Sequence, residues 1–101
     1  MTTTNKSFLF IDDVRNPPDV VFAGDVSKSI WDVARTYDEA IRLISSNEYE
    51  YISFDFDLGE AKTGLDILIW IDANDKWPDK VYFHSQHPVG VMQMTAFVEN
   101  R

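Results

Sequence analysis

Residues 7–13 read SFLFIDD, in which four apolar side chains in a row are followed by two carboxylates. An unbroken apolar run of this length is typical of a strand buried on both faces, as in a parallel sheet. The prolines of residues 16–18 (NPP) keep the residues before them out of the helical region, so no helix follows directly. The stretch predicts a strand over residues 7–11, then a loop over 12–28 with a short turn around residues 20–22.

The rest of the chain alternates between short apolar runs and longer amphipathic segments. Thr36 followed by Glu39 has the spacing of a capping box, so a helix is expected to begin there and to run to about Ser46. Strands that alternate with helices indicate an α/β fold with a parallel sheet. The first helix is expected to bury Ala40, Ile41, Leu43 and Ile44. The other predicted elements are strands over 30–35, 51–54 and 80–84, a helix from Thr63 or Gly64 to about Ala73 that is covered over much of its circumference, and a helix over about 89–98.

The composition is that of a small acidic domain. The 101 residues carry a formal net charge of -8, and 45% of them are hydrophobic, which predicts one domain over residues 1–101. The absence of cysteine excludes disulfides, thiolate metal sites and a cysteine nucleophile. The acidic balance argues against an extended nucleic-acid surface, which depends on Lys and Arg. No membrane span of roughly 18 apolar residues and no signal-peptide core is present, so we expect a soluble, cytoplasmic protein.

Carboxylates follow the first and third predicted strands. Asp12 and Asp13 end the first, and Asp55 and Asp57 come directly after the third. Ligands bind beyond the carboxyl ends of the strands in an open parallel sheet, so these side chains are expected to meet at one edge. Carboxylates that lie close together repel, and a hard cation such as Mg²⁺ removes the repulsion. These four aspartates are therefore predicted metal ligands; the alternative is that each only begins a turn.

Other polar residues stand near the same edge. His84 ends the fourth strand, where it suits proton transfer beside carboxylates, although a lone histidine there is also a common structural residue. Ser85 can donate to a phosphoryl oxygen. Arg15 can neutralise a phosphate or pair with the aspartates, and Thr63 precedes a helix, where it either binds an anion or only caps. His87 is expected in an exposed loop and completes, with Arg15 and Thr63, the candidate substrate-binding residues.

Four segments in this order resemble a known family. They are LFIDDVRNPP (9–18), ISFDFDLG (52–59), TGLD (63–66) and HSQHPVG (84–90), and together they are similar to the cyclic-phosphate-processing receiver-like domains, relatives of the response-regulator receivers. The resemblance implies a receiver-like (flavodoxin-like) open sheet, with Asp12 and Asp13 at the metal pair and Asp55 at the phosphoacceptor position of receivers. It places His84 and Ser85 on the family's His-Ser motif. It also implies action on a cyclic phosphate, such as an RNA 2′,3′-cyclic end or a cyclic nucleotide.

The chain departs from the family's pattern in the loop before Leu58-Gly59 and near its end. Phe56 stands where the family commonly has histidine, and His87 where it commonly has asparagine. The loss of an imidazole at Phe56 puts turnover in doubt more than binding. The 16 residues after Ser85 are enough for one helix only, so we expect about four strands, without the fifth strand of receivers and its phosphate-binding lysine. Phosphorelay is therefore the weaker interpretation.

Three functions fit these residues. The first is a metal-dependent cyclic phosphodiesterase that uses Mg²⁺ or Mn²⁺, with Asp55, His84 and Ser85 as catalytic residues and a small cyclic phosphate or an RNA end as substrate. The second is a non-catalytic module that sequesters a nucleotide or phosphate, with Phe56 stacking on a base. The third is an acidic interaction or inhibitor domain for a basic protein, because residues 48–60 hold five carboxylates and no Lys or Arg. The sequence does not predict an oligomeric state.

Overall fold

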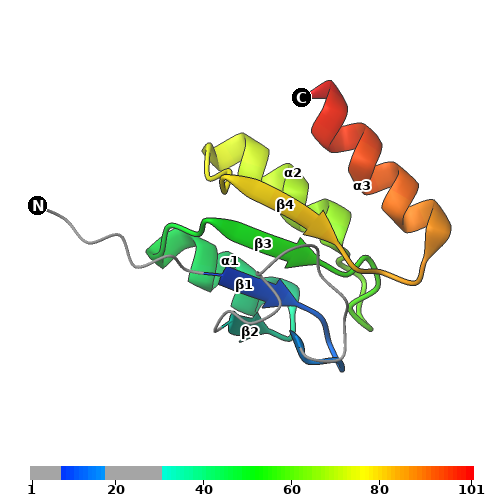
Figure 1. Cartoon of the computed structure of the whole chain (residues 1–101), viewed down its shortest axis with the longest axis horizontal. Coiled ribbons are helices and arrows are strands. Elements are labelled where there is room, and N and C mark those ends of the chain that lie inside the picture. Colours follow the sequence, from blue (N-terminus) through cyan, green and yellow to red (C-terminus); the bar gives the residue numbers. More distant parts are fainter. Residues whose placement is uncertain (1–7, 18–30) are drawn as a thin grey trace, which may run out of the picture.

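Strand β1 (Phe8–Ile11) lies inside a four-stranded sheet whose strand order is β2-β1-β3-β4. Each neighbouring pair of strands is parallel. The other elements are β2 (Trp31–Ala34), α1 (Tyr37–Ser46), β3 (Tyr51–Phe54), α2 (Gly64–Asn74), β4 (Lys80–Phe83) and α3 (Pro88–Asn100). This computed structural model describes residues 8–17 and 31–101, and within them the predicted receiver-like α/β fold with a parallel sheet of four strands is confirmed (Figure 1).

The two faces of the sheet are covered by different kinds of side chain. Leu9 and Ile11 of β1 belong to the buried core that also contains residues of α1 and α2. In Figure 1 these two helices lie behind the sheet. On the other face Phe8 stacks on Tyr51, with ring centroids 4.7 Å apart, and lies 5.4 Å from Trp31. Because both faces are apolar, β1 shows no alternation of polar and apolar residues.

The element boundaries differ slightly from the predicted ones. Strand β4 ends at Phe83, so His84 is the first residue after the strand, and α3 runs on to Asn100. Helix α2 is less covered than predicted, since Ile69 is 46% exposed. Most of the predicted 12–28 loop, the turn around residues 20–22 and the first residue of the predicted second strand lie outside the described residues. None of the helices described here is both long and apolar enough to cross a membrane.

Helix α1 begins where the capping signal predicts. The Thr36 side chain accepts a hydrogen bond from Glu39 N at 3.1 Å. In a capping box the Glu39 carboxylate would accept from the backbone N–H of Thr36. Here it accepts from the N–H of the preceding residue, Arg35, at 2.6 Å. Ala40 and Ile44, four residues apart, are fully buried. Ile41 and Leu43, predicted to be buried, are only partly buried at the edges of the same face.

Helix α2 begins in close contact with the end of β3. Gly64 N donates to Phe56 O at 2.9 Å. A Cβ atom at Gly64 would collide with the backbone carbonyl oxygen of Asp55, and it would lie 3.0 Å from Met94 Sδ. Glycine at this position therefore lets the first turn of α2 hold the backbone of Asp55 in place.

Gly64→Ala is expected to lower the free energy of unfolding by about 2 kcal/mol, because a collision with backbone atoms is relieved only by moving the helix or the strand end. Alanine is otherwise the better helix former by up to about 1 kcal/mol, so helix propensity alone gives the opposite sign. Urea unfolding of the two proteins measures the difference. A variant as stable as the parent chain, or more stable, would show that α2 is not closely packed on β3.

Candidate functional site

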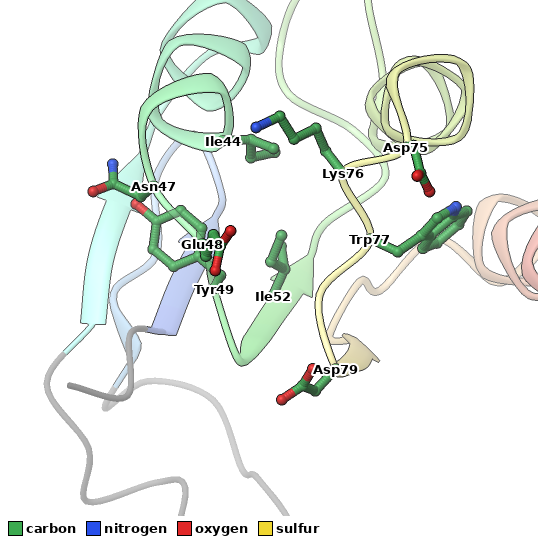
Figure 2. A pocket seen from close by; sticks show the side chains of 9 residues that line it. All are labelled: Ile44, Asn47, Glu48, Tyr49, Ile52, Asp75, Lys76, Trp77 and Asp79. Atoms are coloured by element: carbon green, nitrogen blue, oxygen red, sulfur yellow. The ribbon is translucent and has the colours of Figure 1, made fainter. Parts of the chain in front are cut away.

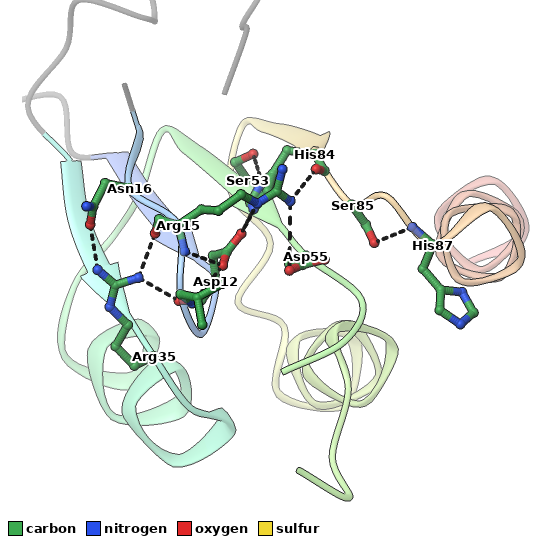
Figure 3. Close-up of polar contacts among 10 residues, drawn as sticks. Asp12, Arg15, Asn16, Arg35, Ser53, Asp55, His84, Ser85 and His87 are labelled. Atoms are coloured by element: carbon green, nitrogen blue, oxygen red, sulfur yellow. Dashed lines mark hydrogen bonds and ion pairs between the residues drawn. The ribbon is translucent and has the colours of Figure 1, made fainter. Parts of the chain in front are cut away.

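Three side chains meet at the carboxyl edge of the sheet, each directly after a strand. Asp12 follows β1, Asp55 follows β3 and His84 follows β4. Backbone hydrogen bonds continue the ladder past the strands: Asp55 N donates to Ile11 O at 2.9 Å, and His84 N to Phe54 O at 3.0 Å. One ligand atom of each of the three side chains lies within 4.8 Å of the other two. The edge thus brings together two of the predicted metal ligands and the predicted histidine (Figure 3).

The carboxylate of Asp12 is fully buried and all its acceptor positions are engaged. Oδ1 accepts from the backbone N–H groups of Val14 at 2.9 Å and Arg15 at 2.7 Å. Oδ2 accepts from Arg15 Nε at 3.0 Å and lies 3.1 Å from His84 Nε2. Burial acts to raise the pKa of Asp12, but these donors outweigh it and hold the pKa below its ordinary 3.8. Asp12 is therefore an ionised residue that organises the loop after β1.

The imidazole of His84 is buried, with its side chain 2% exposed. It stacks on Phe10, with ring centroids 4.3 Å apart, and its Nδ1 lies 2.6 Å from Ser53 Oγ. Burial lowers the pKa of His84 from 6.5 to about 4, against the attraction of Asp12. In a neutral ring the nitrogen that faces an ionised carboxylate carries the proton. Nε2–H therefore donates to Asp12, and Nδ1 accepts from the Ser53 hydroxyl.

Asp55 has the most exposed side chain of the three, at 12% against 2% for His84 and 0% for Asp12. Burial raises the pKa of Asp55 above its ordinary 3.8, and the negative charge of Asp12 adds to the rise. The Ser85 hydroxyl hydrogen bond and the charge of Arg15 act in the opposite direction. Two neighbouring carboxylates thus differ in their proton affinity, which is a common property of acid–base sites.

Arg15 lies between the two carboxylates. Its Nη2 donates to the backbone oxygen of His84 at 2.8 Å and lies 3.9 Å from Asp55 Oδ2, while its Nε bonds Asp12. Of the two roles considered from the sequence, phosphate binding and pairing with aspartates, these contacts are those of pairing. Arg15 also lines a cavity, so it can reach a ligand bound there.

A cavity of about 350 Å³ opens beside Asp55. Its volume is suited to a small ligand. Asp12 and His84 do not line it; they lie behind Asp55 and Arg15 in the protein. The lining consists of Asp13, Val14, Arg15, Asp55, Asp57, Ser85, Gln86 and His87. Most of the residues predicted to bind metal or substrate therefore line one cavity. Asp12 and His84 are buried and contact Arg15, which forms part of its wall.

Asp13 and Asp57 line the cavity but are not part of the three-residue cluster found among residues 8–17 and 31–101. Asp57 Oδ1 accepts from Gly59 N at 2.9 Å, which is the turn-forming role considered as its alternative. An added Cβ at Gly59, whose φ is +69°, would lie 2.8 Å from Asp13 Oδ2. Glycine therefore both permits this turn and makes room for the second aspartate.

Thr63 and His87 both stand at helix starts. Thr63 precedes α2, and its backbone N–H donates to Asp66 Oδ2 at 2.8 Å, which is the capping alternative. It does not line the cavity beside Asp55. His87 is exposed as predicted, and its Nδ1 accepts from Gly90 N at 2.9 Å at the start of α3. Of these two candidate substrate-binding residues, His87 alone reaches the cavity.

Phe56, which stands where the resemblance implies a histidine, packs against the start of α3. Its ring lies 4.8 Å from that of His87, and a Cβ at Gly90 would collide with it. Phe56 is not among the residues that line the cavity. Its contacts are those of a packing residue and not those of a platform on which a base stacks.

Two residues of the site were not singled out from the sequence. Ser53 is a fully buried polar residue in β3 whose hydroxyl bonds His84. A serine inside the apolar run YISF was the available signal, since a buried hydroxyl needs a partner. Arg35, after β2, uses Nη1 to bond the backbone oxygens of Asp12 (3.1 Å) and Arg15 (2.6 Å). Nothing in the sequence around Arg35 indicates that it reaches another loop.

A second cavity of about 310 Å³ lies at the opposite end of the sheet (Figure 2). Ile44 and Ile52 contribute apolar surface, and the Tyr49 hydroxyl is already bound to Asp32 Oδ2 at 2.8 Å. The remaining lining residues are Asn47, Glu48, Asp75, Lys76, Trp77 and Asp79. No predicted site residue lies here, and Asp12, Asp55 and His84, the group of described residues whose side chains could hold a metal ion, lie at the other end.

Asp12, Asp55 and His84 fit a divalent ion by donor type and by spacing. These ligand atoms already have partners, because Asp12 Oδ2 and His84 Nε2 contact each other and Arg15 contacts both carboxylates. An ion at this position must displace at least one of these contacts.

Comparison with known proteins gave one result that bears on this site. A family model described as the cyclic-phosphate processing receiver domain matches residues 7–100, which is nearly the whole chain. Comparison with curated proteins and with solved structures gave no significant match.

Proposed function

The chain belongs to the cyclic-phosphate processing receiver domain family, and from this membership we propose that it hydrolyses a cyclic phosphodiester in the cavity beside Asp55. The observation that carries the proposal is the arrangement of this cavity wall. A carboxyl group with a raised pKa, a hydroxyl and a guanidinium lie next to one another there, in Asp55, Ser85 and Arg15. These are the groups that proton transfer and phosphate binding require.

The proposed roles follow from which groups reach the cavity. Asp55 acts as the general base, because its raised pKa brings it closer to the pH at which a base is most effective. Arg15 and Ser85 contact the phosphoryl oxygens, where Arg15 offsets the charge that develops in the transition state. His84 does not line the cavity, so we assign it the positioning of Asp12 in place of direct proton transfer.

The proposed reaction is attack of water on phosphorus. A bond forms between phosphorus and the water oxygen, and the bond from phosphorus to one ribose oxygen breaks. Asp55 takes a proton from the attacking water, the departing ribose oxygen takes a proton from a solvent water, and Asp55 then returns its own proton to solvent. A 2′,3′-cyclic phosphate thereby becomes a phosphate monoester. A divalent ion held by Asp12, Asp55 and His84 would add polarisation of the phosphate and of a bound water.

Incubation of the purified protein with 2′,3′-cyclic nucleotides, with Mg²⁺ or Mn²⁺ and separately with EDTA, tests the proposal. We expect a 2′- or 3′-monophosphate as product, identified by chromatography and ³¹P NMR. Asp79→Asn is the matched control, because Asp79 is exposed just before β4 at the far end of the sheet, and it should leave the rate unchanged. No product from 2′,3′-cyclic nucleotides, 3′,5′-cyclic nucleotides or a cyclic-phosphate RNA end would reject hydrolysis.

Binding without turnover is the second candidate function. It is favoured by Phe56, which occupies the position of the family's histidine and packs on α3, so this loop supplies no imidazole. Calorimetry with the same nucleotides separates the two functions. Saturable binding with no product supports sequestration, and product formation rejects it.

A further inference from the structure

The cluster of Asp12, Asp55 and His84 contains a positive charge that belongs to the protein. Arg15 Nε lies 3.0 Å from Asp12 Oδ2, and Arg15 Nη2 lies 3.9 Å from Asp55 Oδ2. The Arg15 side chain is 25% exposed, so these contacts are only partly screened by water. The guanidinium thus compensates the same two carboxylates that a divalent ion would bind.

The position of Arg15 is fixed from several directions. Its backbone N–H donates to Asp12 Oδ1 at 2.7 Å, and its Nη2 donates to the His84 carbonyl at 2.8 Å. Arg35 Nη1 holds the carbonyl oxygen of Arg15 at 2.6 Å, and Arg35 Nη2 bonds Asn16 Oδ1 at 2.5 Å. The main-chain bonds fix the loop of residues 12–16 that carries Arg15, and the bonds to His84 O and Asp12 Oδ2 fix its guanidinium. Figure 3 shows the guanidinium groups of Arg15 and Arg35 on either side of the loop that follows β1.

The ligand atoms of Asp12 and His84 are already engaged in hydrogen bonds. Asp12 accepts from two backbone N–H groups through Oδ1, and its Oδ2 is shared by Arg15 Nε and His84 Nε2. The second ring nitrogen of His84 bonds Ser53 Oγ at 2.6 Å. A carboxylate has about four acceptor positions and a neutral imidazole has one. A divalent ion therefore finds no unused lone pair on Asp12 or His84.

We propose that the Arg15 guanidinium is the resident cation of this site, and that a divalent ion binds Asp12 and Asp55 only by displacing it. The arginine and the ion are then alternatives at the same two carboxylates. When an ion displaces it, the guanidinium remains in the wall of the cavity, where it can bind a phosphate. The inference concerns the same site as the proposed function, but it is tested by metal affinity and does not require turnover.

Mn²⁺ binding to the full chain, measured by electron paramagnetic resonance and calorimetry, tests the competition. Arg15→Gln removes the competing charge and should bind Mn²⁺ about tenfold more tightly than the parent chain. Arg15→Lys keeps the charge but loses the forked contact, so its affinity should fall between the two. Arg42→Gln removes the same charge from an exposed position on α1 and should change the affinity less than twofold. Equal or weaker binding by Arg15→Gln overturns the proposal.

A measurement on the unchanged protein covers the case in which Arg15→Gln does not fold. The ¹H–¹⁵N signal of Arg15 Nε is followed during a Mg²⁺ titration, because loss of its bond to Asp12 must shift it. Mg²⁺ binding that leaves this signal in place overturns the proposal. Tighter Mn²⁺ binding by the variant without hydrolysis by any form rejects the proposed function alone. Hydrolysis with an unchanged Mn²⁺ affinity rejects this inference alone.

Discussion

Asp55→Asn is expected to lower the rate of cyclic-phosphate hydrolysis about 1000-fold, within the range that a positioned general base contributes. Asparagine keeps the size and hydrogen-bonding shape of the side chain but cannot take a proton from water. The rate is measured with saturating 2′,3′-cyclic nucleotide and compared with that of Asp79→Asn, which carries the same substitution at the far end of the sheet. A folded Asp55→Asn protein with the parent rate would contradict the role of Asp55.

The same variant should remain folded, and its stability gives an independent test of the environment of Asp55. The folded-state pKa of Asp55 is raised, so the folded protein holds this proton more tightly than the unfolded chain does. The pKa shift of Asp55 therefore adds to the free energy of unfolding below the ordinary pKa of 3.8. This contribution is lost as the pH rises through the folded-state pKa. Urea unfolding should therefore show Asp55→Asn gaining stability relative to the parent chain between pH 4 and pH 7. A relative loss over that interval would mean that the carboxylate is stabilised where it lies.

Acidification from pH 7 to pH 4 is expected to cost the folded protein about 3 kcal/mol through His84 alone. The pKa of His84 is about 4 in the folded state and 6.5 in its ordinary state. As the pH is lowered through this interval, the unfolded chain binds a proton and the folded protein does not. The free energy of unfolding therefore decreases as the pH is lowered. Each unit of pKa difference is worth roughly 1.4 kcal/mol. Free energies of unfolding at pH 7, 5.5 and 4.5 trace the loss.

His84→Gln isolates this contribution from that of the carboxylates. Glutamine can donate to Asp12 in place of Nε2–H but does not titrate, so the loss of stability between pH 6.5 and pH 4 should be smaller by most of that amount. The parent chain and the variant share all other titrating groups. Equal pH dependence in the two proteins would show that His84 is not held neutral.

The sheet and its functional edge could be predicted because they depend on local patterns. The apolar run of β1 has no polar residue, so it had to be a strand covered on both faces, and the carboxyl ends of parallel strands lie at one edge. That reasoning also placed Asp12, Asp55 and His84 together. Thr36 marked the start of α1 because threonine is a preferred N-cap residue, whose hydroxyl accepts a bond from a backbone N–H of the first turn.

Which side chains at that edge are buried and which face the cavity could not be predicted, because this depends on the conformation of each loop. Asp12 and Asp13 are adjacent in sequence, yet Asp12 is fully buried and Asp13 faces the cavity. Hydrogen bonds from Val14 and Arg15 decide this, and they exist only once the loop has formed. The contact of Arg35 with the same loop joins residues 20 positions apart and leaves no periodic trace in the sequence. Arg15 illustrates the same limit, since pairing and phosphate binding require the same residue type.

The stack of His84 on Phe10 gives the buried site its own spectroscopic marker. A proton that lies over the face of an aromatic ring is shielded by the ring current, so the carbon-bound protons of His84 should resonate upfield of their usual positions. The chain has two histidines, and the rings they contact are arranged differently. His84 lies parallel to Phe10 at 4.3 Å with an interplanar angle of 7°, whereas the exposed His87 is tilted by 35° to Phe56 at 4.8 Å, so the two imidazoles should be shielded to different extents. The two imidazoles can therefore be told apart in a simple proton spectrum. Ion, phosphate or nucleotide binding can then be followed at the centre of the site without labels, reporter groups or turnover.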